Sequence, residues 1–272
     1  MNHVHAKNHP IVSCIVPCFN ELPHILNESL GSLLNQTFKN FECIVVDEST
    51  NFESASACKN FCQLDGRFTY IRPSKKLGLA GSLNLGIEQA KGLFLARFDS
   101  DDICRHDRFA LQVDYLNANP EIGVVGSSID IIGENGSLIR HRSYPVDHSE
   151  IERNFIFSSA IAHPTAMLRK SVLIHSGRAY DPSFQLAEDL DLWLRLLAIG
   201  VKFGNLPQAL VKYRQQHTGR HKNHWKFNIK ARLKNISRPY FARKIIGIFG
   251  IAFWAILPAE TQKFFFKLIH LK

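Results

Sequence analysis

Residues 93–102 read Leu93-Phe94-Leu95-Ala96-Arg97-Phe98-Asp99-Ser100-Asp101-Asp102. A short apolar run of this kind, bounded by polar residues, is typical of a buried strand, and here it ends directly in carboxylates. Carboxylates that crowd together repel one another, and burying them is costly unless a cation lies between them. This stretch therefore predicts a buried strand with a carboxylate site at its carboxyl end.

Outward from this strand, apolar runs alternate with stretches of helical spacing. Strands are expected at 11–17, 41–46, 68–71 and 93–98, with helices near 22–34, 54–64 and 79–90. The order implies an α/β fold, with a mostly parallel central sheet flanked by helices on both faces and a Rossmann-like nucleotide-binding half. Further along, helices are expected at 106–119 and 188–199, and strands at 122–125, 128–132, 201–203 and 209–213.

Carboxylates follow three of the expected strands. The first strand runs into Glu21, the second into Asp47 and Glu48, and the fourth into Asp99. Ligands of open α/β sheets bind at the carboxyl ends of the strands. Mg²⁺ and Mn²⁺ prefer oxygen ligands and are typically held by one or two carboxylates together with substrate phosphates. We therefore expect a Mn²⁺ or Mg²⁺ site at Asp99 and Asp101 for a diphosphate-bearing substrate, the alternative being a solvated acidic turn that caps the next helix.

Glu188 and Asp189 form a second acidic centre at the start of the expected helix 188–199. The helix dipole favours acids there, so a capping role alone would explain them. A positioned carboxylate can also take the proton of an acceptor hydroxyl. The glycine-rich phosphate motifs of dehydrogenases and P-loop NTPases are missing from the sequence, which argues against both classes.

Five ordered segments together resemble the family 2 glycosyltransferases of the GT-A fold. They lie at 12–21, 44–49, 78–86, 96–102 and 187–193. Two further segments, 163–165 and 211–214, look like the branch that builds bacterial capsule, exopolysaccharide and lipopolysaccharide. The resemblance implies an inverting transfer of a sugar, most commonly from a UDP-sugar, in which a metal offsets the charge on the departing diphosphate. Glu48 departs from the pattern, because many relatives have a second Asp there.

The resemblance also implies roles for the matching residues. Asp189 would be the general base, with Glu188 beside it. Asp47 would accept a hydrogen bond from uracil, Asp99 would contact the ribose or the metal, and Asp101 would hold the metal. Asn84 would shape the pocket near the diphosphate, Asp102 would lie close to the donor sugar, and Arg214, with His217, would reach the diphosphate or the acceptor from a closing loop. The nucleotide pocket would be lined by Pro17, Phe19 and Glu21.

The positive charge of the chain lies at its carboxyl end. Residues 201–272 carry 15 Lys and Arg against one acid, whereas residues 1–200 carry 18 against 23. This asymmetry suggests an acidic partner, either anionic lipid or nucleic acid. The basic stretch contains 13 apolar residues at 245–257, which as a helix would cover roughly 20 Å, short of the ~30 Å hydrocarbon core. Basic residues and Trp254 beside this run favour a segment in the bilayer interface; a core helix and a re-entrant or spanning segment are the alternatives.

The expected organisation is a disordered N-terminus at 1–10, a GT-A domain at 11–216, and a basic amphipathic helical tail at 217–272 that associates with membrane. The enzyme would work peripherally at the cytoplasmic face of the bacterial inner membrane, on a lipid-linked saccharide. An anionic membrane surface would be its partner, and no nucleic acid is expected. Three other classes compete: a sugar nucleotidyltransferase, which should carry a Gly-rich basic loop after the first strand, a nucleic-acid-binding protein acting through the basic tail, and a non-catalytic scaffold. The six cysteines are expected as reduced, buried thiols.

Overall fold

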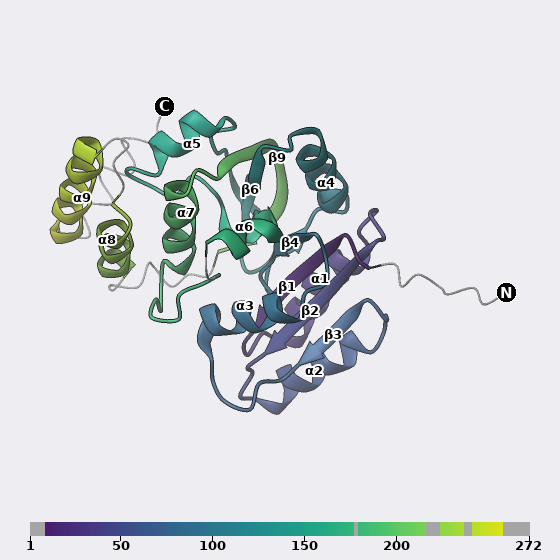
Figure 1. Cartoon of the computed structure of the whole chain (residues 1–272). Helices are drawn as coiled ribbons and strands as arrows, with labels where there is room; N and C mark the ends of the chain where they lie inside the picture. Colours follow the sequence, from purple (N-terminus) through teal and green to yellow (C-terminus); the bar gives the residue numbers. More distant parts are fainter. Residues whose placement is uncertain (1–8, 177–178, 216–223, 237–240, 258–272) are drawn as a thin grey trace.

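The computed structural model describes residues 9–176, 179–215, 224–236 and 241–257 (Figure 1). These form a sheet with the strand order β3-β2-β1-β4-β8-β6-β9-β5, and β7 pairs with β6. The strands are β1 (Val12–Cys18), β2 (Phe41–Asp47), β3 (Phe68–Ile71), β4 (Phe94–Arg97), β5 (Ile103–Cys104), β6 (Ile122–Ile132), β7 (Leu138–Arg142), β8 (Met167–Arg169) and β9 (Lys202–Arg214).

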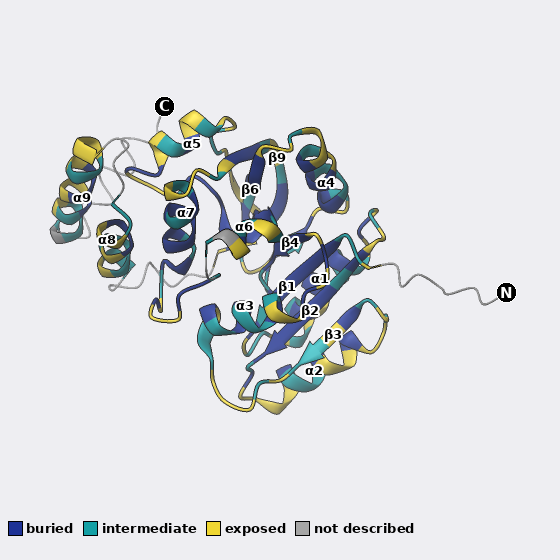
Figure 2. Ribbon diagram, viewed as in Figure 1, coloured by how far each residue is buried: buried dark blue, intermediate teal, exposed yellow. Residues whose placement is uncertain are grey.

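Helices cover both faces of the sheet, which makes three layers (Figure 1). One face packs against α1 (Pro23–Leu34), α2 (Phe52–Cys62) and α4 (Arg108–Ala118). The other packs against α3 (Gly78–Gln89), α5 (His148–Asn154), α6 (Lys170–His175) and α7 (Glu188–Ala198). Figure 2 shows the central strands and the inner sides of these helices as buried. The expected α/β fold with a central sheet between helices is thus confirmed.

Alternate side chains of the central strands enter two different cores, one on each face of the sheet, because successive side chains along a strand point to opposite faces. In β1, Cys14 and Val16 point to the core under α1 and α2, whereas Ile15 points to the core under α3 and α7. In β2, Val45 and Ile44 divide in the same way. A strand buried on both faces carries a nearly continuous apolar run, which is why these strands stood out in the sequence.

The first four strands of the order are parallel, so the ends of β1, β2 and β4 meet at one edge. Beyond β4 the sheet becomes mixed. The short β8 is antiparallel to both β4 and β6, and β6 runs parallel to β9.

The prediction of two separate strands at 122–125 and 128–132 is wrong, because β6 is continuous. In its polar middle, the backbone N–H of Ser127 donates to Thr165 Oγ1 at 3.0 Å, and the Ser127 hydroxyl donates to the Ser128 carbonyl at 2.8 Å. The prediction of separate strands at 201–203 and 209–213 is also wrong, since β9 is continuous. The strand continues through Pro207, which has no N–H for the ladder; there the register passes from Leu206 to Ala209 while β6 advances by one residue.

Two helices lie on the α7 side of the molecule, at the opposite end from β1–β3 (Figure 1). They are α8 (His224–Lys234), which packs on α7, and α9 (Phe241–Ile256), which packs on α8. The Lys234 ammonium pairs with Asp181, and the Asn235 amide donates to Asp191 Oδ1 at 3.0 Å. Part of the positive charge of the tail therefore holds α8 against the preceding domain. Among the described segments, none of the helices has the length and apolarity that a membrane crossing requires.

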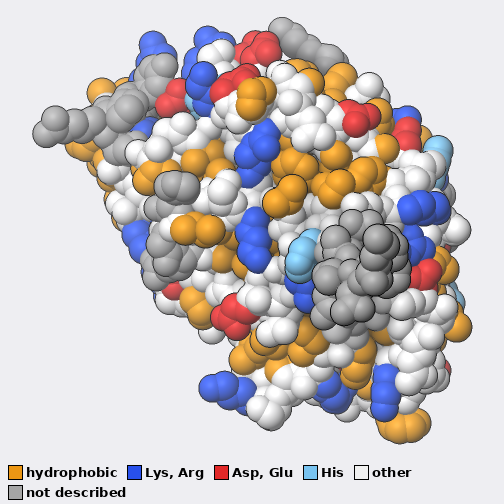
Figure 3. Space-filling model, turned by 45° about the vertical axis from the view of Figure 1, so that its right-hand side comes forward, with side chains coloured by type: hydrophobic (Ala, Val, Ile, Leu, Met, Phe, Trp, Pro, Cys, Tyr) orange, Lys and Arg blue, Asp and Glu red, His pale blue; other side chains and the backbone are white. Residues whose placement is uncertain are grey.

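The face drawn in Figure 3 carries several hydrophobic patches with Lys and Arg side chains between them. Most of the N-terminus expected to be disordered, residues 1–8, lies outside the described residues, as do His217 and residues 258–272 of the tail. The boundary at residue 216 remains a prediction.

Candidate active site

The acids that follow β4 form a compact cluster. The carboxylate ligand atoms of Asp99, Asp101 and Asp102 all lie within 4.8 Å of one another. Asp102 is fully buried; its Oδ1 accepts from the Arg214 N–H at 2.8 Å, and its Oδ2 has no hydrogen-bond partner among the described residues. Burial, followed by the charge of Asp99, raises the pKa of Asp101 to about 6 and raises that of Asp102 well above its usual range. A buried carboxylate oxygen without a partner, beside two further carboxylates, suits an oxygen-preferring divalent cation.

Glu21 joins this cluster from the loop after β1. Its Oε1 lies 3.5 Å from the Ser100 hydroxyl. Burial and the charges of Asp101 and Asp99 raise the pKa of Glu21 to about 7. The structure therefore brings the ends of β1 and β4 together, as expected for acids at the carboxyl ends of parallel strands.

Arg214 braces the acidic loop from the end of β9. Its Nε donates to the Asp101 carbonyl at 2.9 Å, and its Nη2 lies 2.6 Å from Glu28 Oε2. Its side chain is buried. The sequence placed Arg214 in a closing loop, whereas the structure makes it the last residue of a strand. Contact with the diphosphate or acceptor remains a prediction for this residue.

The second acidic centre opens α7. The preceding residue, Ala187, has a left-handed backbone with φ 60°, which is uncommon for a residue other than glycine. Glu188 is buried, whereas Asp189 is partly exposed. Burial, followed by the charge of Asp189, raises the pKa of Glu188 to about 8, and burial also raises that of Asp189. Near neutral pH, Glu188 thus holds a proton more readily than an ordinary glutamate.

Arg97, the last residue of β4, connects the two acidic centres. Its guanidinium is almost fully buried and pairs with Asp99. Its charge also lowers the pKa of both Glu188 and Asp189 against the larger effect of burial. The charge of this one buried cation therefore stabilises carboxylates from two distant parts of the chain, Asp99 and the pair Glu188 and Asp189.

A buried aromatic pair closes the site next to Glu188. His163 Nε2 lies 2.8 Å from the Tyr180 hydroxyl, and His163 Nδ1 lies 3.8 Å from Glu188 Oε1. Burial and the charge of Arg97 lower the pKa of His163 well below its usual range, so its imidazole is neutral. The amide of Asn84 on α3 exchanges two hydrogen bonds of 2.9 Å with the backbone of Tyr180. Asn84 thus borders the site through Tyr180, and its contact with a diphosphate stays a prediction.

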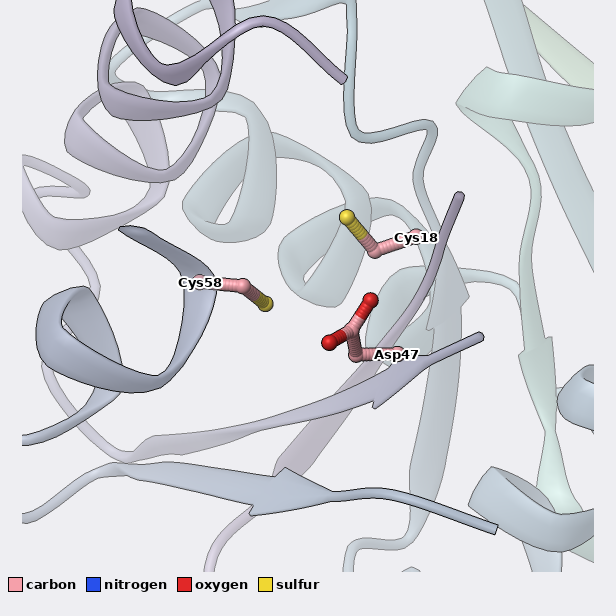
Figure 4. Close-up of side chains that lie close together, drawn as sticks. All are labelled: Cys18, Asp47 and Cys58. Carbon is pink, nitrogen blue, oxygen red and sulfur yellow. The ribbon is translucent and has the colours of Figure 1, made fainter. Parts of the chain in front are cut away.

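Asp47, at the end of β2, is fully buried and has partners on both oxygens. Oδ1 accepts from the Ser49 N–H at 2.8 Å, and Oδ2 accepts from Tyr70 at 2.8 Å and from Arg72 at 2.9 Å. The sulfur atoms of Cys18 and Cys58 lie within 4.8 Å of a carboxylate oxygen of Asp47, and the Cys58 sulfur points toward that carboxylate (Figure 4). Two thiols and a carboxylate resemble a site for a soft metal.

The contacts of Asp47 oppose a metal at this second cluster, because both of its carboxylate oxygens already accept hydrogen bonds from protein donors. Asp47 is already neutralised by Arg72. We therefore interpret these side chains as the inner wall of the region where the nucleobase contact of Asp47 was predicted, and not as a metal centre.

The loop after β1 is tied to the loop after β2 by Asn20, which has a left-handed backbone with φ 58°. Its Oδ1 accepts from the Thr50 N–H at 2.8 Å and from the Asn51 N–H at 3.2 Å. Beside it, Phe19 is half-exposed under the Lys76 ammonium, which lies 4.8 Å from the ring centre, while Pro17 lies within β1. The loop thus presents Phe19 at the surface.

Glu48 shows why a longer acid is useful after Asp47. Its carboxylate accepts from the N–H groups of Leu77 and Gly78, the latter at 3.0 Å, at the start of α3. It therefore caps that helix from the neighbouring strand end.

The sequence did not single out Arg97, Asn20, Tyr180 or His163 as individual site residues. Only Arg97 carried a usable signal, since a cation inside an apolar strand needs a buried partner. The role of the others depends on contacts between residues that are far apart in the chain.

Comparison with known proteins agrees with this geometry. Residues 13–177 match the family described as Glycosyl transferase family 2. The chain belongs to this family. The match includes the acids after β1, β2 and β4.

Named relatives are glycosyltransferases. The O-antigen biosynthesis glycosyltransferase WbnJ of Escherichia coli is 35% identical over 190 residues, which cover 68% of this chain and 72% of WbnJ. The amylovoran biosynthesis glycosyltransferase AmsE of Erwinia amylovora is 30% identical over 203 residues, which cover 74% and 75% of the two chains. The protein is therefore a glycosyltransferase, and the predicted resemblance and enzyme class are confirmed.

Solved structures share the fold. TarS 1–349 of S. aureus in complex with UDP-GlcNAc has a TM-score of 0.68 at 18% identity, covering 92% of this chain and 77% of that one. The mannosyltransferase PcManGT of Pyrobaculum calidifontis, in complex with GDP-Man and Mn²⁺, has a TM-score of 0.64 at 17% identity, covering 97% and 81%. These two proteins thus share the fold of this chain.

Proposed function

We propose that this glycosyltransferase moves a sugar from a UDP-sugar, with inversion, onto a hydroxyl of a lipid-linked saccharide during the synthesis of a bacterial surface polysaccharide. The observation that carries the proposal is the pairing of a carboxylate cluster, suited to a cation, with a carboxylate pair across Arg97. The names of WbnJ and AmsE support a polysaccharide product. UDP-GlcNAc in TarS supports a nucleotide-sugar donor.

Asp99, Asp101 and Asp102 would hold Mn²⁺ or Mg²⁺. The cation would supply positive charge where the diphosphate leaves. Arg214 donates from its Nε to the Asp101 carbonyl and from its backbone N–H to the Asp102 carboxylate, so it keeps the cluster in place. Glu21, from the loop after β1, accepts a hydrogen bond from Ser100 in the loop after β4 and so closes the same side of the cluster.

Asp189 would take the proton of the acceptor hydroxyl. Because Glu188 has a pKa of about 8, it stays largely protonated near pH 7, and Asp189 is the member of the pair left as a carboxylate. Asp189 is also the more exposed of the two. Its raised pKa makes it a stronger base than an ordinary aspartate.

The membrane part of the proposal rests on α9. Ile246, Phe249 and Phe253 lie at helical spacing and are 64%, 70% and 62% exposed, while the opposite side of the helix buries Ile248 and Ile251. An exposed apolar stripe on a helix that follows a basic segment suits the interface of an anionic bilayer. We infer that α9 holds the enzyme peripherally at the cytoplasmic face of the inner membrane.

The donor is tested by calorimetric binding and hydrolysis of a UDP-sugar panel with and without Mn²⁺. We expect one UDP-sugar to bind only with the metal, and Asp101→Asn to abolish this binding. Asp114→Asn, at an exposed position on α4, is the matched control and should bind normally. Failure of the folded wild-type protein to bind any nucleotide sugar would remove the donor assignment and favour a non-catalytic scaffold.

The membrane attachment is tested by co-sedimentation with vesicles that contain phosphatidylglycerol. Phe249→Asp should lower the partition coefficient about tenfold or more, because burial of one Phe side chain contributes roughly 1.5–3 kcal/mol. Phe52→Asp, which changes a Phe on α2 that is 87% exposed, should leave the partition coefficient unchanged. Equal loss in both variants would contradict a specific role for α9.

A further inference from the structure

A pocket lies between the end of α5 and helices α7, α8 and α9, apart from the carboxylate site. Its walls are largely apolar, with Phe155, Leu194, Leu197 and Ile248 among them. Arg232 from α8 and Lys244 from α9 also line it. The pocket therefore combines hydrocarbon walls with two cations.

Arg232 is a buried cation with hydrogen bonds but no opposite charge. Its Nη1 donates to the carbonyls of Phe155 and Ile156, and its Nε donates to Asn228 Oδ1 at 2.9 Å. Among the described residues, no carboxylate forms an ion pair with it. Burial lowers its pKa to about 10. Carbonyls at the end of a helix favour a cation, yet they leave a full charge in a region with little water, which is costly.

Glu152, the acid that lines the pocket, interacts with Lys244. Its charge raises the pKa of Lys244 against the larger, opposite effect of burial. One positive charge, that of Arg232, is therefore left over in the pocket. An anion that enters beside Arg232 would compensate this charge, and hydrogen bonds to an ionised group are stronger than neutral ones.

The surroundings of the pocket suit a ligand with a hydrocarbon chain. α9 covers the pocket closely, since a Cβ added to Gly247 would lie 2.6 Å from the carbonyl oxygen of Ile156. The outer face of the same helix carries the exposed stripe of Ile246, Phe249 and Phe253. A chain that leaves the pocket past α9 would thus enter the apolar medium proposed for that stripe.

We propose that this pocket binds a lipid phosphate, with the phosphate beside Arg232 and the hydrocarbon chain against the apolar wall of α7 and α9. The proposal rests on the membrane attachment proposed above and extends it from a surface to a defined site. The same chemistry is offered by a bilayer phospholipid and by the lipid carrier of the acceptor. Leu197 lies about 12 Å along α7 from Asp189, at ~1.5 Å per residue. A lipid-linked acceptor could therefore place its lipid phosphate in this pocket and its sugar near Asp189, both along α7.

The test uses soluble probes, so that it is independent of vesicle binding and of donor turnover. Binding of farnesyl phosphate, farnesol, inorganic phosphate and dihexanoylphosphatidylglycerol to the full-length protein is measured by calorimetry. We expect a phosphate-bearing lipid to bind at least tenfold more tightly than farnesol or inorganic phosphate. Arg232→Gln should weaken it about tenfold or more, because hydrogen bonds to charged groups contribute roughly 1.5–3 kcal/mol. Lys226→Gln, at an exposed position of α8, is the control and should bind as the wild type does.

A second variant guards against misfolding of Arg232→Gln. Ala198→Trp fills the mouth of the pocket from an exposed helical position and should abolish binding without lowering the melting temperature. Preference for farnesyl phosphate would assign the pocket to the acceptor carrier, and preference for the phospholipid to the bilayer; either supports a lipid-phosphate site. Equal binding of farnesol, unchanged binding in Ala198→Trp, or no binding of either phosphate lipid would overturn the proposal, whatever the result for UDP-sugars.

Discussion

Replacing Arg97 by Met removes the cation that joins the two acidic centres. Arg97 is buried, pairs with Asp99, and lowers the pKa of Asp101, Asp102, Glu188 and Asp189. Removing one partner of a buried ion pair typically lowers the free energy of unfolding by about 3–5 kcal/mol. With about 2–4 °C per kcal/mol for a protein of this size, a loss of 3 kcal/mol corresponds to roughly 6–12 °C in melting temperature.

The loss should depend on pH. Asp101, Glu21 and Glu188 have pKa values of about 6, 7 and 8 in the folded protein, above those of an unfolded chain. A carboxyl with a raised pKa stabilises the folded state at low pH, and this contribution is lost as the pH rises through that pKa. At pH 5.5 Asp101 and Glu188 are mostly protonated and interact little with Arg97, whereas at pH 8 Asp101 is ionised and Glu188 is about half ionised. The variant should therefore lose clearly more stability at pH 8 than at pH 5.5.

The assay is thermal unfolding followed by circular dichroism at both pH values, with and without Mn²⁺. Mn²⁺ should restore part of the stability at pH 8, because a bound cation replaces some of the missing charge. Arg97→Lys should lie between the wild type and Arg97→Met. Arg105→Met, which breaks an exposed ion pair with Asp107, is the control and should cost about 1 kcal/mol or less. An equal loss at both pH values, or a loss no larger than that of Arg105→Met, would refute the reasoning.

Three further outcomes are expected. Asp189→Asn should lower kcat in a sugar-transfer assay by a factor of about 10²–10⁴, because a general base acts in the transition state. The affinity for the UDP-sugar, measured by calorimetry, should stay unchanged. Retention of the wild-type rate would exclude Asp189 as the base. In the wild type, Mn²⁺ should raise the melting temperature more at pH 8 than at pH 5.5, since protons compete with the metal for Asp101, and a shift independent of pH would place the metal elsewhere. Ala187→Gly should raise the melting temperature by about 2–4 °C, because a left-handed backbone costs Ala about 1 kcal/mol. Ala198→Gly, at the other end of α7, should lower the melting temperature, because Gly is a poorer helix former than Ala. A drop in both variants would contradict strain at Ala187.

The sequence predicted the parts of the fold that have a local signal. The strands β1, β2, β3 and β4 were placed to within about two residues, because strands buried on both faces carry uninterrupted apolar runs. The short β5 and β8 were not predicted. Two or three residues carry no periodicity, and their conformation is set by pairing with β9, β4 and β6.

The candidate site was predictable where its residues are contiguous. Asp99, Asp101 and Asp102 are neighbours in the chain, so their clustering followed from the motif itself. The bracing role of Arg214 was not predictable, because it acts on Asp101 across more than a hundred residues. Likewise, the basic tail indicated an acidic partner, but only the structure shows that Lys234 meets an acid of its own chain.

The six cysteines have a consequence for how this protein can be handled. All six thiols are free and buried in the folded chain, including Cys18 and Cys58 beside Asp47. An oxidant therefore meets them chiefly after the chain has opened, and every disulfide formed then withdraws molecules from the refolding equilibrium. Heating in air should yield a scan-rate-dependent, irreversible transition, whereas a reductant should make it reversible. Burial of the six thiols thus makes the reversibility of unfolding depend on redox conditions, for a kinetic reason that is separate from catalysis.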